Sequence, residues 1–352
     1  MHSQDENILS EDSVKRYVLP AYNLQYADIS QIKIKNTDKQ RAVYKVSNDG
    51  KYYCLKKVYF PIEELLFVYS AIEWLYRFDV NVPRILATID NNRFVSFKNR
   101  LFILTPWIDG GKCDYDNMLH VRNSILNLGK MHKVTENFHP IPGSICRKGL
   151  ENISSSLNRH FQQLLIYSNF AYKFRDTFSS IFLDYFDNCI RLAEISAEIS
   201  DTIDRKKLSQ TLCHLDYVNK NIIFDKNDNI WVIDFDKCKI DYCVHDLAYY
   251  FRRLLKRDST DWNLDLLLNS LNNYEKYHPL NLDEYKYLLV YLSFPQKYWK
   301  ISKDYYSNIK KCNKKYLITL LEKSVNNCQH QLNFVEEFKN IIEEKFNVKL
   351  MK

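Results

Sequence analysis

The chain has 352 residues, of which 46% are hydrophobic, and a formal net charge of +7 at pH 7. This length predicts two lobes or domains, each large enough to bury its own core. No run of about 18 apolar residues is present, so a membrane span is not indicated. The positive charge is spread along the chain rather than gathered in blocks, so we expect no nucleic-acid partner. The first residues lack the apolar stretch of a secretory signal, and we expect a cytoplasmic protein.

Alternating apolar and polar residues dominate the first hundred positions. Residues 31–36, 41–47 and 51–60 predict three strands, and Asn48-Asp49-Gly50 predicts a tight turn between the last two. These strands are expected to form an antiparallel meander. Helical spacing then predicts a helix of about four turns after Pro61. Two or three further strands are expected among 81–86, 93–97 and 100–108.

The pattern changes after the turn at residues 109–111. Helical periodicity dominates from residue 118 onward, strand signals return only at 211–236, and helices resume at residue 245. We therefore expect an α+β chain with a small β-rich lobe carrying one helix, a hinge near residues 105–110, and a larger helical lobe with one short hairpin.

The hairpin segment carries an unusual set of polar residues. His214, Asp216 and Asn221 follow the pattern HxDxxxxN, and Asp234-Phe235-Asp236 comes after a strand, a turn and a second strand. This spacing places two acids and an amide at the ends of paired strands. Asp and Asn often do no more than build turns, and that alternative stays open for the motif taken alone.

The hairpin motif resembles the catalytic loop and metal-binding segment of the protein-kinase-like fold, and more closely its aminoglycoside phosphotransferase and choline kinase branch. The resemblance implies a bilobal fold and an enzyme that uses ATP and Mg²⁺. It implies that Asp216 orients the acceptor hydroxyl, and that Asn221 and Asp234 hold the metal against the nucleotide phosphates. His214 is expected to pack or hydrogen-bond behind the loop.

The predicted small lobe contains a lysine, Lys56, that could bind nucleotide phosphates together with these acidic residues. Cys54 and Lys56 share one face of their predicted strand, and Leu55 lies on the other. CLK resembles the corresponding strand of kinase-like nucleotide lobes, which implies that Lys56 reaches the α- and β-phosphates. Order along the chain favours Glu64, rather than Glu63 or Glu73, as its ion-pair partner, although these glutamates may equally form a solvent-exposed helix face.

FILTPWIDGG resembles the hinge between the lobes of these proteins. The resemblance implies that the backbone from Thr105 to Trp107 hydrogen-bonds adenine. Two departures point the other way. The turn at residues 36–40 has no glycine, whereas many kinases cover the phosphates with a glycine-rich loop, and Leu215 stands where the phosphotransferase branch commonly has glycine. These departures leave open a site that does not catalyse.

A narrower resemblance involves the second half of the chain. ILNLGKMHK, Asp246 within HDLAYYFRRLLK, and above all FPQKYWK within residues 291–308 are similar to the bacterial spore-coat proteins of the CotS-like family. This resemblance implies assembly into the spore coat from the mother-cell cytoplasm, with other coat proteins as partners. Asp246 is expected to brace the catalytic loop from inside. The aromatic residues near FPQKYWK may equally be helix packing.

Two functions follow from these observations. The first is an ATP- and Mg²⁺-dependent phosphotransferase that acts on a hydroxyl of a small molecule or coat component, and the second is an inactive kinase-like binding protein of the spore coat. We expect a nucleotide lobe over residues 1–106 and a helical lobe over 107–352. The latter would contain the hairpin at 211–236 and a helical substrate insert at about 145–210.

Overall fold

The computed structural model describes residues 8–35 and 41–351. The glycine-free turn at residues 36–40 lies outside the described residues. The chain forms two compact units that are each built from several segments. The first unit contains residues 1–113, 134–148 and 219–239, and the second contains residues 114–133, 149–218 and 240–352.

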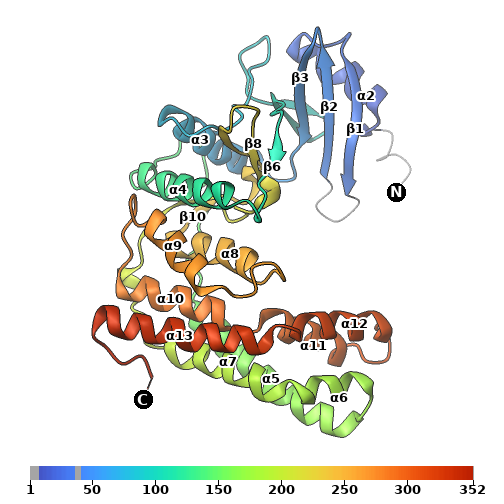
Figure 1. The fold of residues 1–352 in the computed structure, drawn as a ribbon. Coiled ribbons are helices and arrows are strands. Elements are labelled where there is room, and N and C mark those ends of the chain that lie inside the picture. The colour runs from blue at the N-terminus through green and yellow to red at the C-terminus, as the bar shows by residue number, and fades with distance from the viewer. Residues whose placement is uncertain (1–7, 36–40, 352) are drawn as a thin grey trace. The chain divides into compact units, whose positions relative to one another are not determined.

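The first unit contains a five-stranded antiparallel sheet (Figure 1). Its order is β1 (Asp28–Lys35), β2 (Arg41–Asn48), β3 (Lys51–Lys57), β5 (Arg100–Pro106) and β4 (Val95–Phe97). The predicted meander is confirmed, because Asn48 pairs with Lys51 across a two-residue turn. Asp49 and Gly50 both have positive φ, 49° and 73°, as the right-handed twist of a tight hairpin favours.

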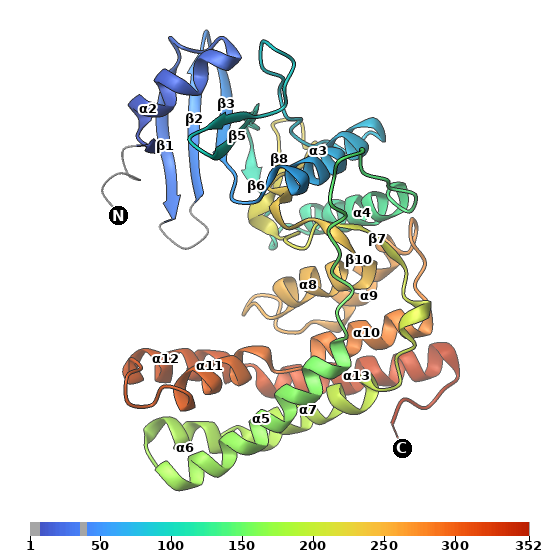
Figure 2. The same ribbon diagram turned by 180° about the vertical axis from the view of Figure 1, so that it is seen from behind.

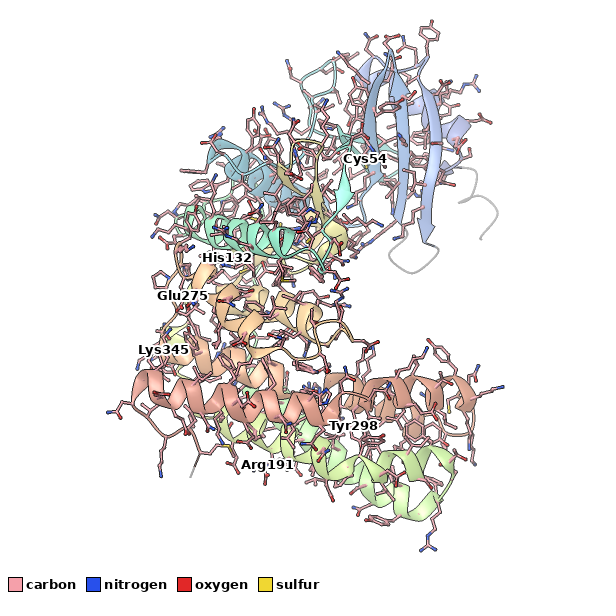
Figure 3. All side chains as sticks on the ribbon, in the orientation of Figure 1. Cys54, His132, Arg191, Glu275, Tyr298 and Lys345 are labelled. Carbon is pink, nitrogen blue, oxygen red and sulfur yellow. The ribbon has the colours of Figure 1, made fainter. Side chains whose placement is uncertain are left out.

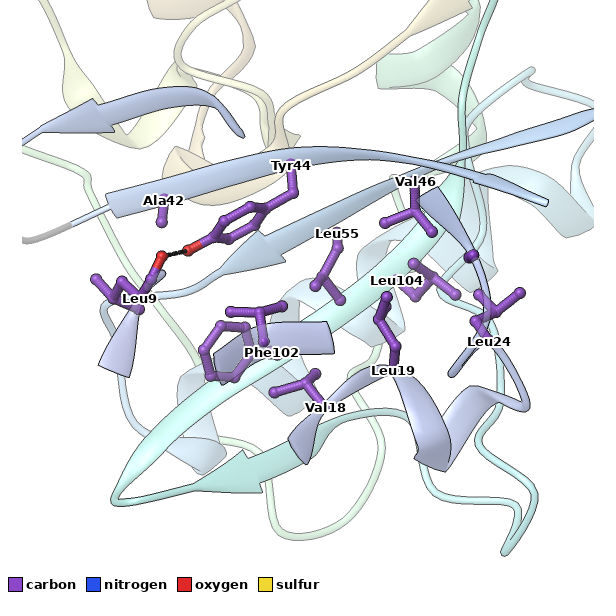
Figure 4. Packing of buried hydrophobic residues seen from close by; sticks show 12 residues of the cluster. Leu9, Val18, Leu19, Leu24, Ala42, Tyr44, Val46, Leu55, Phe102 and Leu104 are labelled. Atoms are coloured by element: carbon purple, nitrogen blue, oxygen red, sulfur yellow. Dashed lines mark hydrogen bonds between the residues drawn. The ribbon is translucent and has the colours of Figure 1, made fainter. Parts of the chain in front are cut away.

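One face of this sheet packs against α2 (Glu11–Tyr17) and the short helix η1 (Leu19–Tyr22), which the sequence did not reveal. Leu55, Phe102 and Leu104 are fully buried there with residues of both helices (Figure 4). The Tyr44 hydroxyl donates a hydrogen bond to the carbonyl oxygen of Leu9, 2.5 Å away. Because neighbouring residues of a strand point to opposite faces, burial of Leu55 directs Lys56 to the other face.

The helix predicted after Pro61 is α3 (Ile62–Arg77), with Pro61 at its N-cap. Of the two or three strands expected next, β4 and β5 form, whereas the segment at 81–86 is irregular. Pro83 has no N–H to contribute to a ladder. The segment is instead tied down by single hydrogen bonds, from the Leu86 N–H to the Leu104 carbonyl and from the Asn81 side chain to the Ile230 carbonyl.

The predicted hairpin is confirmed as β8 (Ile222–Phe224) and β9 (Ile230–Val232), and β6 (Gly111–Lys112) pairs with its outer edge. The carboxylate of Asp225 accepts hydrogen bonds from the backbone N–H groups of Asn227 and Asn229, at 2.8 and 3.0 Å. These residues build the turn, as Asp and Asn commonly do. The short helices η3 (Asn219–Asn221) and η4 (Phe235–Lys237) flank the other end of the hairpin.

The second unit is mainly helical. Figure 2 shows α5 and α7 side by side, and α10 packs against α7, α8 and α13. Strand β7 pairs with β10, a strand that the sequence did not predict. No helix within residues 8–35 and 41–351 is both long and apolar enough to cross a membrane. The elements are α4 (Met118–Val134), α5 (Ile153–Phe174), α6 (Thr177–Asp184), α7 (Phe186–Ser200), η2 (Arg205–Lys207), β7 (Gln210–Cys213), β10 (Lys239–Tyr242), α8 (Cys243–Leu255), α9 (Leu264–Tyr274), α10 (Leu282–Ser293), α11 (Gln296–Tyr306), α12 (Lys314–Val325) and α13 (Cys328–Phe346).

Candidate active site

Lys56 meets two carboxylates within the first unit. Its Nζ lies 2.6 Å from Asp234 Oδ1 and 2.6 Å from Asp236 Oδ1, although about 180 residues separate it from them in the chain. Burial alone would lower the pKa of Lys56, but the charges of Asp236 and Asp234 raise it above its usual value. The amine is therefore held in its charged form, as a group that contacts phosphate requires.

Asp236 is only 3% exposed, and its two oxygens have different surroundings. Oδ1 contacts Lys56, whereas Oδ2 is buried without a hydrogen-bond partner in the part of the chain that the structure describes. Arg41 Nη1 is 3.9 Å from this oxygen, at the margin of an ion pair. A buried carboxylate oxygen without a donor is costly, and a bound cation would satisfy it.

The base of the hairpin brings a third oxygen donor to the same chain segment. The backbone N–H of Ile233 donates to the Asn221 carbonyl, 3.0 Å away, so Asn221 lies across the hairpin from the residue that precedes Asp234. Asn221 is 4% exposed. Asp234 has a φ of 67°, in the left-handed region. Amide and carboxylate oxygens are the hard donors that Mg²⁺ prefers, and the unsatisfied oxygen of Asp236 fits such an ion.

The predicted ion pair between Lys56 and Glu64 is not formed. Glu64 Oε2 lies 3.2 Å from Arg147 Nε, and Arg147 also donates from Nη2 to the Asp236 carbonyl at 2.8 Å. The guanidinium of Arg147 thus forms the ion pair with Glu64, whereas Lys56 forms ion pairs with the two aspartates. Glu73, the other alternative of interest, binds Arg84 through both oxygens, at 2.9 and 2.7 Å.

Within the segment from Thr105 to Trp107, where the sequence predicts contacts with adenine, the strand register decides which backbone groups point away from β3. The Trp107 N–H donates to the Tyr52 carbonyl at 3.0 Å, and Thr105 pairs with Cys54 on the same side. Because backbone groups alternate along an antiparallel ladder, the groups that point away from β3 belong to the even-numbered residues. Pro106 has only a carbonyl to offer, so the outward pair is the Pro106 carbonyl and the Ile108 N–H.

Asp216 lies in a braced loop of the second unit. Its backbone N–H donates to His214 Nδ1 at 3.2 Å. Asp216 is buried, with 6% of its surface exposed. Asp246, on α8, accepts hydrogen bonds from the N–H groups of His214 and Leu215, at 2.6 and 3.0 Å. The brace predicted for Asp246, and the position of His214 behind the loop, are both confirmed.

Leu215 adopts a φ of 56°, in the left-handed region that glycine reaches without steric cost. This conformation gives the physical reason for a glycine here in similar proteins. Asp246 accepts hydrogen bonds from the N–H groups of both His214 and Leu215, and these bonds hold the leucine in this conformation.

His132, Cys213 and Asp246 approach one another within 4.8 Å, as the ligands of a metal ion might. Both oxygens of Asp246 already accept hydrogen bonds from loop amides, and His132 Nδ1 is 2.6 Å from the Tyr274 hydroxyl. Burial would raise the pKa of Asp246, but the hydrogen bond and charge of His132 and the neighbouring His214 lower it. The group is thus a buried polar brace.

Replacing Asp246 with Ala is expected to destabilise the protein by about 3–5 kcal/mol, because two loop amides lose their acceptor and His132 loses the carboxylate that lies 3.5 Å from its Nε2. Urea unfolding followed by circular dichroism measures this loss. Asp304→Ala, at an exposed position, is the control and should change stability by less than about 0.5 kcal/mol. Equal stability of the two variants would contradict the bracing role.

The fold and the lysine–aspartate site define the class of this protein, a kinase-like α+β fold. A family model described as the phosphotransferase enzyme family matches residues 36–280, well over half of the chain. The chain belongs to that family.

Solved structures support the same fold. An aminoglycoside phosphotransferase from Alicyclobacillus acidocaldarius is 17% identical, with a TM-score of 0.76 over 93% of this chain and 96% of that chain. A spectinomycin phosphotransferase solved with ADP and spectinomycin is 18% identical, with a TM-score of 0.63 over 94% and 98%. A microcompartment-associated aminopropanol kinase is 13% identical, with a TM-score of 0.58 over 94% and 98%. At these identities the similarity shows the fold alone.

Proposed function

We propose that the protein transfers the γ-phosphoryl group of ATP to a hydroxyl of a small molecule. The observation that carries the proposal is the contact of Lys56 with Asp234 and Asp236. Lys56 would bind nucleotide phosphates, and Asn221, Asp234 and Asp236 would hold Mg²⁺. When bound, the metal supplies positive charge that stabilises the phosphoryl oxygens. The solved spectinomycin phosphotransferase, which binds ADP, supports the choice of nucleotide.

Adenine recognition follows from the register of β5. The Pro106 carbonyl would accept a hydrogen bond from the adenine amino group, and the Ile108 N–H would donate to a ring nitrogen. Pro106 lies within the segment from Thr105 to Trp107 that the sequence indicates, and the N–H of Trp107 is already donated to Tyr52. The boundary between a nucleotide lobe over 1–106 and a helical lobe over 107–352 remains a prediction of the sequence.

The roles of the chain's own residues follow from their chemistry. Asp216 would accept a hydrogen bond from the acceptor hydroxyl and take its proton as the new oxygen–phosphorus bond forms. His214 and Asp246 keep the loop in place through the amides of residues 214–216. Arg147 ties Glu64 of α3 to the backbone at Asp236, and so positions the metal-binding segment without contacting the reacting groups.

ADP formation from ATP, measured with and without Mg²⁺ in the presence of hydroxyl compounds, tests this function. We expect metal-dependent ADP formation that an acceptor stimulates. Tight binding of nucleotide and metal without any turnover would instead favour the second candidate, a kinase-like binding protein. The observation that favours this second candidate is Leu215, which has a positive φ at a position where glycine is common in this branch.

We also propose, from the similarity of FPQKYWK and its surroundings to CotS-like proteins, that the protein is made in the mother-cell cytoplasm and joins the spore coat through other coat proteins. A fluorescent fusion followed through sporulation of the source organism tests this. Fluorescence that collects around the developing spore is the expected result. Uniform fluorescence that never enters the coat fraction would contradict the coat assignment and leave the phosphotransferase proposal intact.

A further inference from the structure

The helical unit contains a cavity of about 300 Å³ that the roles assigned above do not use. Its walls come from α7, α8, α11, α12 and α13 and from the segment after α8. This volume suits a small molecule of roughly monosaccharide size. The cavity therefore offers a binding site within the same compact unit as Asp216.

The cavity wall is strongly cationic. Five of its side chains carry positive charge and one carries negative charge, and none of the five forms an ion pair with a carboxylate in the described part of the chain. The cations are Arg252, Arg253, Lys256, Lys297 and Lys323, and the anion is Asp258. Most surface cations of globular proteins lie near opposite charges or open solvent, so a concave cluster of one sign points to an anionic occupant.

The two arginines are oriented by neutral partners. Arg252 Nη2 donates to the Tyr291 hydroxyl at 2.8 Å, and its guanidinium lies 4.0 Å from the centre of that ring. Arg253 Nη2 donates to the Tyr249 hydroxyl at 3.0 Å. A tyrosine hydroxyl fixes the direction of a guanidinium without neutralising it. The positive charge thus stays available to a ligand.

The positive charges of the cluster lie close enough to one another to lower the pKa of one of its members. Burial, followed by the charges of Lys297, Arg253 and Arg252, lowers the pKa of Lys256 to about 8. Burial also lowers the pKa of Arg252. Holding these cations together is unfavourable in the empty protein, and a bound anion would relieve that repulsion.

The distinctive stretch FPQKYWK forms part of this wall. Phe294 through Tyr298 line the cavity, and α11 begins there, at Gln296. Helix N-termini carry partial positive charge from their unsatisfied N–H groups, which adds to the charge of Lys297 in the first turn. The Tyr298 hydroxyl donates to the Phe182 carbonyl at 2.7 Å, so this ring anchors the wall to α6 (Figure 3).

Arg253 of the cavity wall interacts electrostatically with the proposed catalytic carboxylate, Asp216. Burial lowers the pKa of Arg253, but its hydrogen bond to Tyr249 and the charges of Tyr249 and Asp216 raise it overall. The ring of Tyr217, the chain neighbour of Asp216, lies 5.9 Å from the ring of Tyr250 on α8, and Arg253 of the cavity wall follows on the next turn of that helix. Helix α8 therefore links the cavity wall to the loop of Asp216 within the same unit.

We propose that this cavity binds the charged end of the phosphate acceptor, which is a small hydroxyl compound carrying a phosphate, sulfate or carboxylate group. This inference rests on the proposed phosphotransferase function. The acceptor oxygen forms a bond to the γ-phosphorus, and the bond from that phosphorus to the β–γ bridging oxygen breaks. ADP leaves with the electron pair, and the hydroxyl proton passes to Asp216. Acceptors that carry amino groups would be repelled by the same wall.

Glucose 6-phosphate, glucose and glucosamine share one ring and differ in charge, so calorimetric titration of each into the full chain tests the inference. We expect glucose 6-phosphate to bind at least tenfold more tightly than glucose, and glucosamine to bind more weakly than glucose. The double variant Lys256→Glu, Lys297→Glu should lose at least tenfold in affinity for glucose 6-phosphate. Thermal unfolding of the same variant, followed by circular dichroism, reports whether its helical unit is folded.

The double variant Lys310→Glu, Lys311→Glu is the matched control, because it changes the net charge equally away from the cavity. Equal loss of glucose 6-phosphate affinity in both double variants, or equal binding of all three sugars, would overturn the inference. ATP turnover with no preference for anions would leave the phosphotransferase function standing and remove only the anion site. Site-specific anion binding without Mg²⁺-dependent transfer would retain the anion site and remove the transferase function.

Discussion

Asp216→Asn is expected to lower kcat for phosphate transfer by about 10²- to 10⁴-fold, the usual contribution of a positioned general base. The amide has almost the same shape as the carboxylate but cannot take the acceptor proton. ATP binding should be unchanged, since the nucleotide is assigned to Lys56, Asn221 and Asp234. The loop should also stay intact, because it is held through its backbone by His214 and Asp246. Steady-state kinetics together with ATP titration measure both quantities.

Asp304→Asn is the control for this change, because it removes one exposed carboxylate from the same unit. It should leave kcat and ATP affinity at their original values. Phosphate transfer by Asp216→Asn at the original rate would contradict the assignment of the base. Loss of ATP affinity in that variant would instead indicate that the residue contributes to the nucleotide site.

Asp234→Ala is expected to reduce phosphate transfer by about 10³-fold or more, because the metal loses a carboxylate ligand and Lys56 loses one of its two partners. Asp236 remains in contact with Lys56, so the lysine should stay in place and bind phosphate without the metal. Only Asn221 and Asp236 would then remain to hold the metal, so Mg²⁺ should strengthen ATP binding by the variant much less than it does for the wild-type protein. The wild-type protein should bind more tightly with the metal, and thermal shifts at several Mg²⁺ concentrations make the comparison.

Asp228→Asn is a matched control for this result, because Asp228 lies in the turn at the opposite end of the same hairpin and is exposed. Asn tolerates the positive φ of 58° found there, so the hairpin should be unaffected. Unchanged Mg²⁺ dependence in Asp234→Ala, or a loss of equal size in Asp228→Asn, would contradict the metal assignment.

Sequence patterns correctly predicted the elements that depend on interactions between residues close together in the chain. The turn at Asn48 and the helix after Pro61 depend on residues that are adjacent in the chain, and both are confirmed. No strand forms at 81–86, where Val82 and Ile85 are buried and Leu86 is partly buried in an irregular segment, because apolar residues do not by themselves imply a ladder. Strand β10 was missed because its pairing with β7 depends on tertiary contacts.

The candidate site divides in the same way. Lys56 and Asp234 were found because their motifs are short and local, and the structure brings their side chains together. Arg147 carried no signal of its own, since its contacts with Glu64 and the Asp236 backbone span 83 and 89 residues. Nothing in the sequence indicated that Arg41, the first residue of β2, lies near Asp236. The partner of Glu64 could not be chosen from chain order, because it depends on which cation lies nearest in the fold.

Calorimetric titration of ATP into the wild-type protein and into Lys56→Met, each with and without Mg²⁺, tests the central claim most directly. The claim is that one amine and a cluster of oxygen donors within the first unit bind a nucleotide and its cation together. The account predicts Mg²⁺-enhanced ATP binding by the wild-type protein and a loss of at least tenfold in affinity on removal of the amine. Failure of the wild-type protein to bind ATP at any Mg²⁺ concentration, or equal affinity in both proteins, would contradict it.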